Sequence, residues 1–225
     1  MSTSTLDGRR DAVPAPVAEI ASVMSTFPAH WALCGGWAVD AWLGLISRDH
    51  GDVDISVFQD DQRALFEHLA PGWELIAHDP NVPDATADPW TGRWLDLPGH
   101  VHARLTGTGK PVLGTIGSLG EAGFGLDIQL GDRKGNQWLI SRDPQVAFAV
   151  EESVKQSPWG IPAVFPEVLL AFKALERRPQ DEQDFNALLP HLTGDQRGKL
   201  RSAIRRLDAA HPWLNALASG PEQVE

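Results

Sequence analysis

The sequence has few of the features that mark secreted and membrane proteins. It contains one cysteine in 225 residues, Cys34, so no disulfide can form within the chain. The first 16 residues, MSTSTLDGRRDAVPAP, have no apolar core. No stretch approaches the roughly 18 apolar residues of a membrane-spanning helix. We therefore expect a protein of the reducing cytoplasm with no membrane partner.

Positive charge is also scarce. The chain carries 19 Lys and Arg against 30 Asp and Glu, a net charge of -11. The excess lies in residues 1–162, which hold 11 basic against 21 acidic residues, whereas residues 163–210 hold 8 against 7. Proteins that bind nucleic acid usually show a basic face, so nucleic acid is not the expected partner. An acidic first part instead favours a cationic small molecule.

Hydrophobic periodicity divides the chain into two parts. In the first part, short apolar strands alternate with helical patterns, and a segment rich in Gly, Pro, Asp and Thr predicts loops and short strands at 79–122. The predicted strands are 30–34, a strand that follows Asp52, 73–78, and a hairpin of 124–130 and 136–140. The predicted helices of this part are 17–27, 37–44 and 60–70.

The second part is helical from Pro166 onward. Its predicted helices are 166–176, 181–189 and 195–210, the first with proline in its first turn. The pattern predicts an α/β (α+β) fold. A small mixed-sheet domain, residues 1–150, precedes a helical C-terminal domain, residues 151–225.

Two aspartates open one of the strands, in the stretch HGDVDISVF at 50–58. Asp52 and Asp54 share one face of the strand, because successive side chains point to opposite faces. Two neighbouring carboxylates repel each other, so one is expected to take up a proton unless a cation or solvent intervenes. Mg2+ is such a cation, since it is held by carboxylates and substrate phosphates. Gly35 and Gly36, at a predicted helix start, let backbone N–H groups approach a phosphate.

The stretch CGGWAVDAWLGLISRDHGDVDIS, at 34–56, resembles the signature of the polymerase-beta-type nucleotidyltransferases. It is most similar to the branch that contains aminoglycoside 2''-nucleotidyltransferases and lincosamide nucleotidyltransferases. The close match covers roughly 30 residues. The matching residues are Gly35, Gly36, Trp37, Asp40, Arg48, His50, Asp52 and Asp54.

The resemblance implies a third carboxylate on a later strand, which binds metal and accepts the proton of the attacking hydroxyl. Asp127 is our candidate because it alternates with the apolar Leu126 and Ile128, and Asp96 is the alternative. Catalysis and metal binding are therefore expected at Asp52, Asp54 and Asp127.

The expected nucleotide-binding residues are Gly35, Gly36, Asp40, Arg48, His50 and Lys173. Asp40 either lies on the exposed side of its helix or orients the loop or the substrate. For His50, the alternative to nucleotide binding is a purely structural role as a hydrogen-bonding group.

Lys173 lies in an apolar helix pattern, where its ammonium group needs a partner: a triphosphate, or one of Asp181 and Asp184. His100 and His102 share a strand face, but no third ligand is evident in the sequence, so no metal site is predicted there.

The predicted function is transfer of a nucleoside monophosphate, AMP from ATP, to a hydroxyl of a small molecule, with two Mg2+ ions and release of pyrophosphate. An aminoglycoside-like or lincosamide-like antibiotic is the expected acceptor. The alternatives are a toxin-type nucleotidyltransferase acting on RNA and a catalytically inactive nucleotide-binding relative. The low basic charge argues against RNA, and the three candidate aspartates argue against an inactive relative.

Overall fold

The computed structural model describes residues 12–78, 88–105, 125–140, 143 and 145–218. Its strands are β1 (Trp31–Leu33), β2 (Val53–Phe58), β3 (Trp73–His78), β4 (Asp88–Pro89), β5 (His100–Leu105), β6 (Leu126–Lys134), β7 (Gln137–Leu139), β8 (Ala147–Ala149), β9 (Val154–Gln156) and β10 (Pro162–Val164). Its helices are α1 (Ala15–Met24), α2 (Gly35–Leu43), α3 (Gln62–Leu69), α4 (Val150–Ser153), α5 (Pro166–Glu176), α6 (Pro179–Leu188), α7 (Gly194–Leu207) and α8 (Trp213–Ala218).

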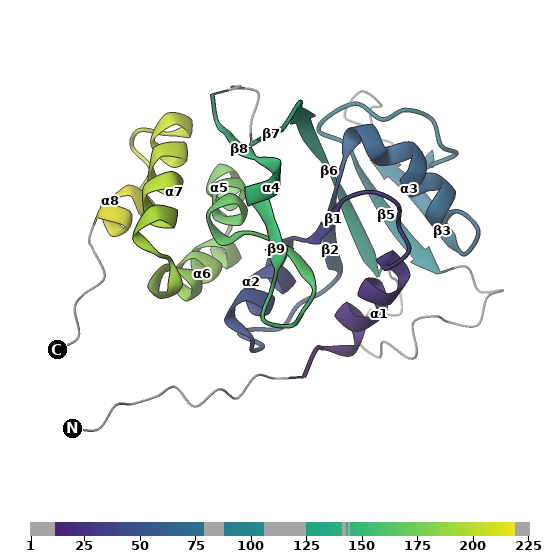
Figure 1. The fold of residues 1–225 in the computed structure, drawn as a ribbon, viewed down its shortest axis with the longest axis horizontal. Coiled ribbons are helices and arrows are strands. Elements are labelled where there is room, and N and C mark those ends of the chain that lie inside the picture. The colour runs from purple at the N-terminus through teal and green to yellow at the C-terminus, as the bar shows by residue number, and fades with distance from the viewer. Residues whose placement is uncertain (1–11, 79–87, 106–124, 141–142, 144, 219–225) are drawn as a thin grey trace.

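The strands form one mixed sheet in the order β4-β3-β5-β6-β2-β1-β10-β9, with β7 and β8 extending from β6 (Figure 1). β2 pairs in parallel with β6, and β1 pairs in parallel with β10. The remaining pairs are antiparallel. The predicted mixed α/β class is therefore confirmed.

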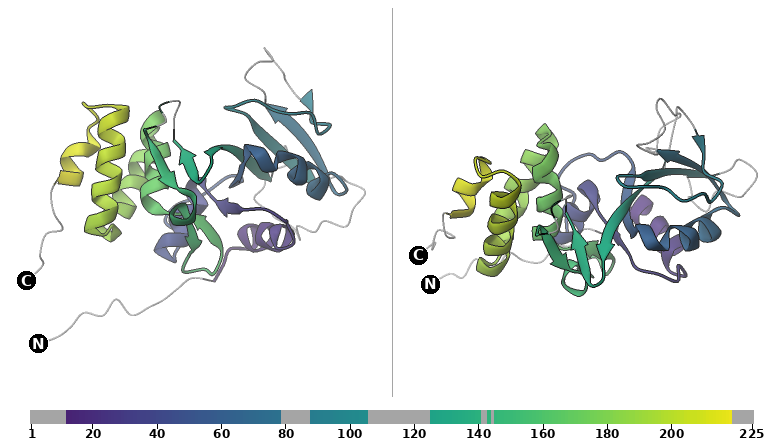
Figure 2. Two further views of the ribbon diagram at one scale, coloured as in Figure 1. Left: turned by 45° about the horizontal axis from the view of Figure 1, so that its top comes forward. Right: turned by 90° about the horizontal axis from the view of Figure 1, so that it is seen from above.

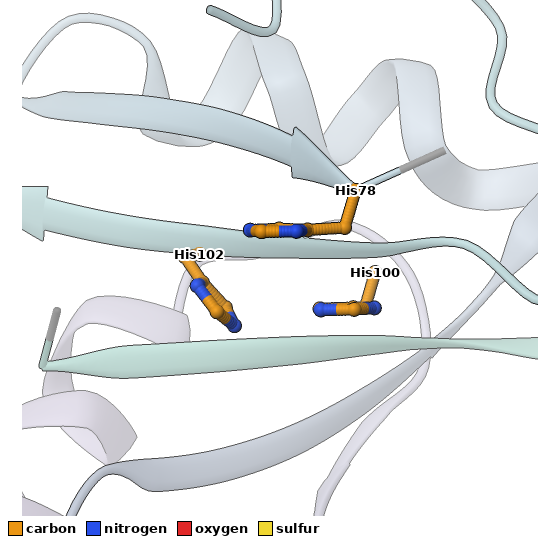
Figure 3. A group of neighbouring side chains, drawn as sticks. All are labelled: His78, His100 and His102. Carbon is orange, nitrogen blue, oxygen red and sulfur yellow. The ribbon is translucent and has the colours of Figure 1, made fainter. Parts of the chain in front are cut away.

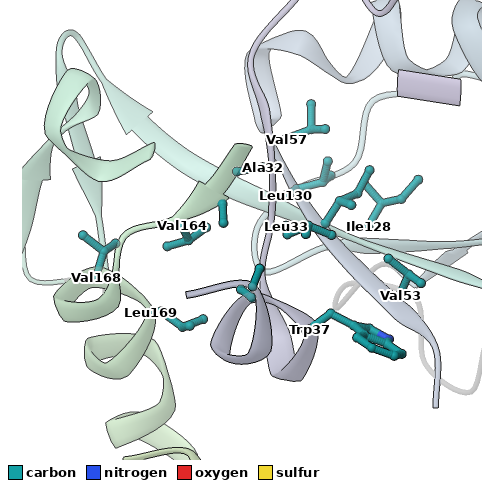
Figure 4. Packing of buried hydrophobic residues seen from close by; sticks show 14 of the residues in the cluster. Ala32, Leu33, Trp37, Val53, Val57, Ile128, Leu130, Val164, Val168 and Leu169 are labelled. Atoms are coloured by element: carbon teal, nitrogen blue, oxygen red, sulfur yellow. The ribbon is translucent and has the colours of Figure 1, made fainter. Parts of the chain in front are cut away.

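The core follows from the alternation of side chains along β2. Val53, Ile55 and Val57 are fully or almost fully buried on one face. Figure 4 shows Val53 and Val57 in one apolar layer with Ile128 of β6 and Leu33 of β1. Because this apolar face fixes the strand register, the opposite face must carry Asp54.

Helices α5 to α8 lie together at one end of the molecule, away from β3 and α3 (Figures 1 and 2). α5 begins at Pro166 and ends at Glu176, as predicted, and α7 packs against it. The predicted domain boundary at residue 150 coincides with the start of α4, before β9 and β10, which belong to the sheet. The division into two domains stays a prediction.

The sequence prediction was incomplete at β5. This strand has six residues and pairs on both sides, with β3 and β6, inside a segment predicted as loops and short strands. Pairing to two neighbours stabilises it despite the Gly and Pro residues nearby. Residues 79–87 and 106–122 of that segment lie outside the described residues. Within the described parts of the chain, no helix has the length and apolar character needed to cross a membrane.

Glycines define both ends of α2. Gly44 closes the helix with a φ of 70°, as predicted. Gly35 opens it with a φ of 61°, and a Cβ atom there would lie 2.1 Å from Oδ2 of Asp54. Both the backbone angle and the available space therefore require glycine at position 35.

We expect Gly35→Ala to lower the free energy of unfolding by at least about 1–3 kcal/mol, the usual cost of a left-handed non-glycine residue. Gly198→Ala is the matched control, because Gly198 lies inside α7 with nothing within 4 Å of its Cβ position. That change should raise the free energy of unfolding by about 0.5–1 kcal/mol. Urea denaturation measures both values. A Gly35→Ala variant as stable as wild type would show that the backbone at α2 is less constrained than described.

Candidate functional site

A cavity of about 830 Å³ lies between the sheet and helix α5. Its wall is formed by the start of α2, the loop before β2, strands β2 and β6, and α5. Its size is in the ordinary range for a small-molecule site. The predicted site residues that line it are Gly35, Gly36, Arg48, His50, Asp52, Asp54, Asp127 and Lys173. The structure therefore brings together every predicted site residue except Asp40.

The three predicted carboxylates meet where β2 and β6 run side by side. Asp54 is directly opposite Asp127 in the parallel register, and Asp52 precedes β2 on the same face as Asp54. Asp96, the alternative third carboxylate, is exposed in the loop before β5 and does not line the cavity. The geometry therefore favours Asp127 over Asp96 as the third member of the group.

The protonation equilibria reflect this crowding. Burial, followed by the charge of Asp127, raises the pKa of Asp54 from 3.8 to about 7, while Lys173 acts in the opposite direction. Burial and the charge of Asp127 also raise the pKa of Asp52, and His102 counteracts them. The arrangement places ionised carboxylates where a cation would stabilise them.

The donor set fits Mg2+. All three side chains offer carboxylate oxygens, the ligands that this cation prefers. Oδ2 of Asp127 accepts a hydrogen bond from Gln129 Nε2 at 3.0 Å, whereas its buried Oδ1 accepts no hydrogen bond and has only a 3.4 Å contact with His102 Nε2. An oxygen of this kind is suited to a metal, because a buried acceptor without a hydrogen bond is costly.

The glycine turn is held close to the carboxylates and to the following loop. A Cβ atom on Gly36 would lie 2.4 Å from both Arg48 Nη2 and His50 Nδ1. No side chain caps α2 at Cys34, and the first N–H groups of a helix have no acceptor within it. The helix start therefore offers backbone donors and a positive dipole end to the cavity.

Asp40 is fully buried, so the interpretation that placed it on the exposed side of its helix is wrong. Its Oδ1 accepts hydrogen bonds from the backbone N–H of Ser47, at 3.1 Å, and from the Ser47 hydroxyl. Its Oδ2 lies 2.6 Å from His50 Nε2. The ring of His50 packs 4.4 Å from that of Trp37. Asp40 therefore orients the loop that carries Arg48 and His50, as the second interpretation predicted.

A chain of ion pairs crosses from this loop to α5 and α6. Arg48 pairs with Asp184 through two contacts of 3.0 and 3.1 Å. Asp184 also lies 2.8 Å from Lys173 Nζ, which lies 3.2 Å from Asp181. Asp181 in turn pairs with Arg178 at 3.0 Å. Both aspartates considered as partners of Lys173 are thus its partners, whereas the pairs of Arg48 and Arg178 were not anticipated.

This chain of ion pairs leaves positive charge toward the cavity. Its three cations, Arg48, Lys173 and Arg178, all line the cavity, while its two aspartates are buried outside the lining. Glu176, which pairs with Arg178 at 3.2 Å, also lines the cavity, so on the cavity side this chain of ion pairs presents three cations and one carboxylate. The cavity therefore has a carboxylate wall on the sheet and, opposite it, a basic wall formed by Lys173 of α5, Arg178 before α6 and Arg48 of the loop before β2.

A histidine group adjoins the carboxylates. Nε2 of His102 lies 3.4 Å from Oδ1 of Asp127, and this contact raises the pKa of His102. Burial lowers the pKa of His78 and of His100, which stand opposite each other on β3 and β5. The sequence analysis missed His78 because it lies 22 residues before His100. The signal that could have identified it is its position at the end of the predicted strand 73–78, where side chains alternate between two faces.

Comparisons with known proteins agree with the motif. Residues 16–73 match a family model described as aminoglycoside-2''-adenylyltransferase, over less than half of the chain. No match was found among curated proteins. The solution structure of the antibiotic-resistance factor ANT(2'')-Ia has 15% identity and a TM-score of 0.54, over 87% of this chain and 92% of that one.

Two further structures are similar. The crystal structure of ANT(2'')-Ia with adenylyl-2''-tobramycin has 14% identity and a TM-score of 0.53, over 85% of this chain and 95% of that one. A lincosamide antibiotic adenylyltransferase with lincomycin bound has 16% identity and a TM-score of 0.49, over 79% of this chain and 97% of that one. The chain thus has the nucleotidyltransferase fold, and over residues 16–73 it resembles the aminoglycoside-2''-adenylyltransferases, as the motif indicated.

We expect Asp54→Asn to stabilise the metal-free protein at high pH. The pKa of Asp54 in the folded protein, about 7, exceeds its usual 3.8, so the folded state loses stability as the pH rises from about 4 to about 7. The asparagine variant does not lose this stability, because an asparagine side chain does not ionise. In EDTA it should unfold at a higher temperature than wild type at pH 8, and the difference should shrink at pH 5.

Thermal unfolding at the two pH values measures this difference. Asp49→Asn is the control, since Asp49 is an exposed aspartate of the same loop. Its effect should be small and the same at both pH values. If Asp54→Asn were less stable than wild type at pH 8, the Asp54 carboxylate would have a structural role instead.

Proposed function

We propose that this protein is an Mg2+-dependent nucleotidyltransferase that moves AMP from ATP to a hydroxyl of a small cationic antibiotic and releases pyrophosphate. The observation that carries the proposal is the meeting of Asp52, Asp54 and Asp127 with the start of α2 and a basic wall in one cavity. Fold, motif and cavity chemistry independently support the same reaction class.

The residues divide the work between metal, phosphate and proton. Asp52, Asp54 and Asp127 would hold two Mg2+ ions, which supply neutralising charge for the triphosphate and lower the pKa of the acceptor hydroxyl. The backbone at Gly35 and Gly36 binds phosphate oxygens. Arg48 and Lys173 add positive charge beside the phosphates as pyrophosphate leaves.

Asp127 takes the proton of the acceptor hydroxyl. The hydroxyl oxygen then bonds to the α-phosphorus as the bond to pyrophosphate breaks. Positioning and charge neutralisation account for most of such a barrier reduction, which suits a site made of carboxylates, backbone and fixed cations. Asp40 contributes indirectly, because it orients the Arg48–His50 loop.

A cationic antibiotic is the proposed acceptor for two reasons. Residues 1–162 carry the acidic excess of the chain, which attracts cations. ANT(2'')-Ia, which shares the fold, has been crystallised with adenylyl-2''-tobramycin. The cytoplasmic location expected from the sequence stays a prediction.

The decisive experiment is a screen of acceptors with labelled nucleoside triphosphates and Mg2+, followed by mass spectrometry of the products. A product heavier by one AMP unit on an aminoglycoside or lincosamide supports the proposal. Labelled RNA would establish the toxin-type activity instead. Nucleotide binding without any transfer would identify a binding protein.

We expect Asp127→Asn to reduce turnover by at least about 10²-fold, the lower end of the usual contribution of general-base catalysis. Triphosphate affinity should change much less, because Asp52 and Asp54 remain as ligands. Turnover and nucleotide affinity are to be measured on the same preparation. Asp96→Asn, at an exposed position outside the cavity, is the control and should act as wild type. The reverse pattern would make Asp96 the third carboxylate.

Lys173→Met should weaken triphosphate binding by about tenfold to a hundredfold, the usual worth of a charged hydrogen bond. It should also cost about 1–3 kcal/mol of stability, because Asp181 and Asp184 each lose one of two cationic partners. Calorimetric titration with the triphosphate and urea denaturation measure the two effects.

Asp181→Asn separates the binding role of Lys173 from its structural role. This variant disturbs the same ion pairs but keeps the lysine in the cavity wall. It should lose stability and retain triphosphate affinity. Equal losses of affinity in both variants would assign Lys173 a structural role alone.

A further inference from the structure

Three histidines from two neighbouring strands form a compact group. His78 ends β3, and His100 and His102 lie on one face of β5, with His78 and His100 directly opposite in the antiparallel register. Figure 3 shows the three rings side by side. Their nearest nitrogen ligand atoms all lie within 4.8 Å of one another, and no other group of three possible ligands in the described residues meets this spacing. The carboxylates of the cavity, as a set, are more widely spaced.

The spacing is close to that of a formed metal site. A Zn–N bond of about 2.0–2.1 Å keeps the nitrogens of one site less than about 4.2 Å apart. The rings of His78 and His100 are parallel, with centroids 4.5 Å apart, and His102 is tilted against both. The ligand nitrogens are therefore close enough for one ion, and the stacked ring of His78 or His100 must turn so that their in-plane lone pairs converge on it. All three residues are partly buried, so a cation can reach them from solvent.

The ligand chemistry differs from that of the carboxylate site. Imidazole nitrogens suit Zn2+, Cu2+ and Ni2+, whereas Mg2+ prefers oxygen. Three histidines also match the three protein ligands of many zinc sites that keep one position open. In such sites a ligating histidine commonly contacts a carboxylate through its other nitrogen. Asp127 stands in that relation to His102, at 3.4 Å.

We propose that His78, His100 and His102 bind one transition-metal cation of the Zn2+ class, at a site next to the Asp52–Asp54–Asp127 group and distinct from it. The site shares a border with the cavity, because His100 lines it. The two sites are also linked by the contact between His102 and Asp127. An ion bound to the histidines would fix the His102 side chain, and His102 in turn orients Oδ1 of Asp127. The proposal does not depend on the nucleotidyl transfer proposed above.

The test is binding of Zn2+ to the full chain, without nucleotide and in the presence of millimolar Mg2+. Equilibrium dialysis should give one Zn2+ per chain, and Co2+ in its place should give the visible absorption of a nitrogen-ligated ion. His78→Gln and His100→Gln, each a polar replacement, should each weaken binding by at least about tenfold, since removing a ligand costs no less than removing its supporting residue. Circular dichroism of the metal-free variants verifies that they are folded.

Two controls locate the ion. His191→Gln removes an exposed histidine and should leave Zn2+ affinity unchanged. The Asp52→Asn and Asp54→Asn double variant should still bind one Zn2+. The proposal is overturned if His78→Gln and His100→Gln bind as wild type does, or if the double aspartate variant loses the ion while the histidine variants keep it. Neither outcome would affect the proposed nucleotidyl transfer, which acceptor screening tests separately.

Discussion

The parallel pairing of β2 with β6 sets negative charge against negative charge inside the protein. Asp54 and Asp127 are opposite each other because the apolar face of β2 allows only one register with the core. Burial, and after it this repulsion, raises the pKa of Asp54 to about 7. In the function proposed above, a cation with its phosphates would relieve this repulsion, between the glycine turn and the basic wall.

The basic wall is itself a structural element. Lys173 and Arg48 both contact Asp184, so one buried carboxylate joins α5 and α6 to the loop between α2 and β2. Buried ion pairs of this kind add little net stability, because desolvation offsets their attraction. Their effect here is geometric: they fix two cations at the surface of the cavity. The same loop is also bound by Asp40, which contacts Ser47 and His50. Two buried aspartates, Asp40 and Asp184, therefore hold it in place.

The sequence was most informative where local patterns decide structure. Alternation around Asp54, glycine at position 44 and proline at position 166 predicted a strand, a helix end and a helix start that the structure contains. It was least informative where contacts between distant segments decide. The pairing of Arg48 with Asp184 joins residues 136 positions apart, and His78 meets His100 only because β3 and β5 are antiparallel. The length and the two-sided pairing of β5 were not predicted for the same reason, since its stability comes from two neighbours in the sheet.

The ion pair between Asp184 and Arg48 also limits which fragments of this protein can fold on their own. A fragment that ended at residue 150 would keep the whole signature motif, yet it would lack β9, β10 and the helix that closes the cavity. Arg48 would lose its carboxylate partner, and the edge of β1 that β10 covers would be open to pairing with other chains. Such a fragment would tend to aggregate. A unit of this protein that is to be exchanged or grafted therefore has to include α6, which carries Asp184, and α7, which packs against α5.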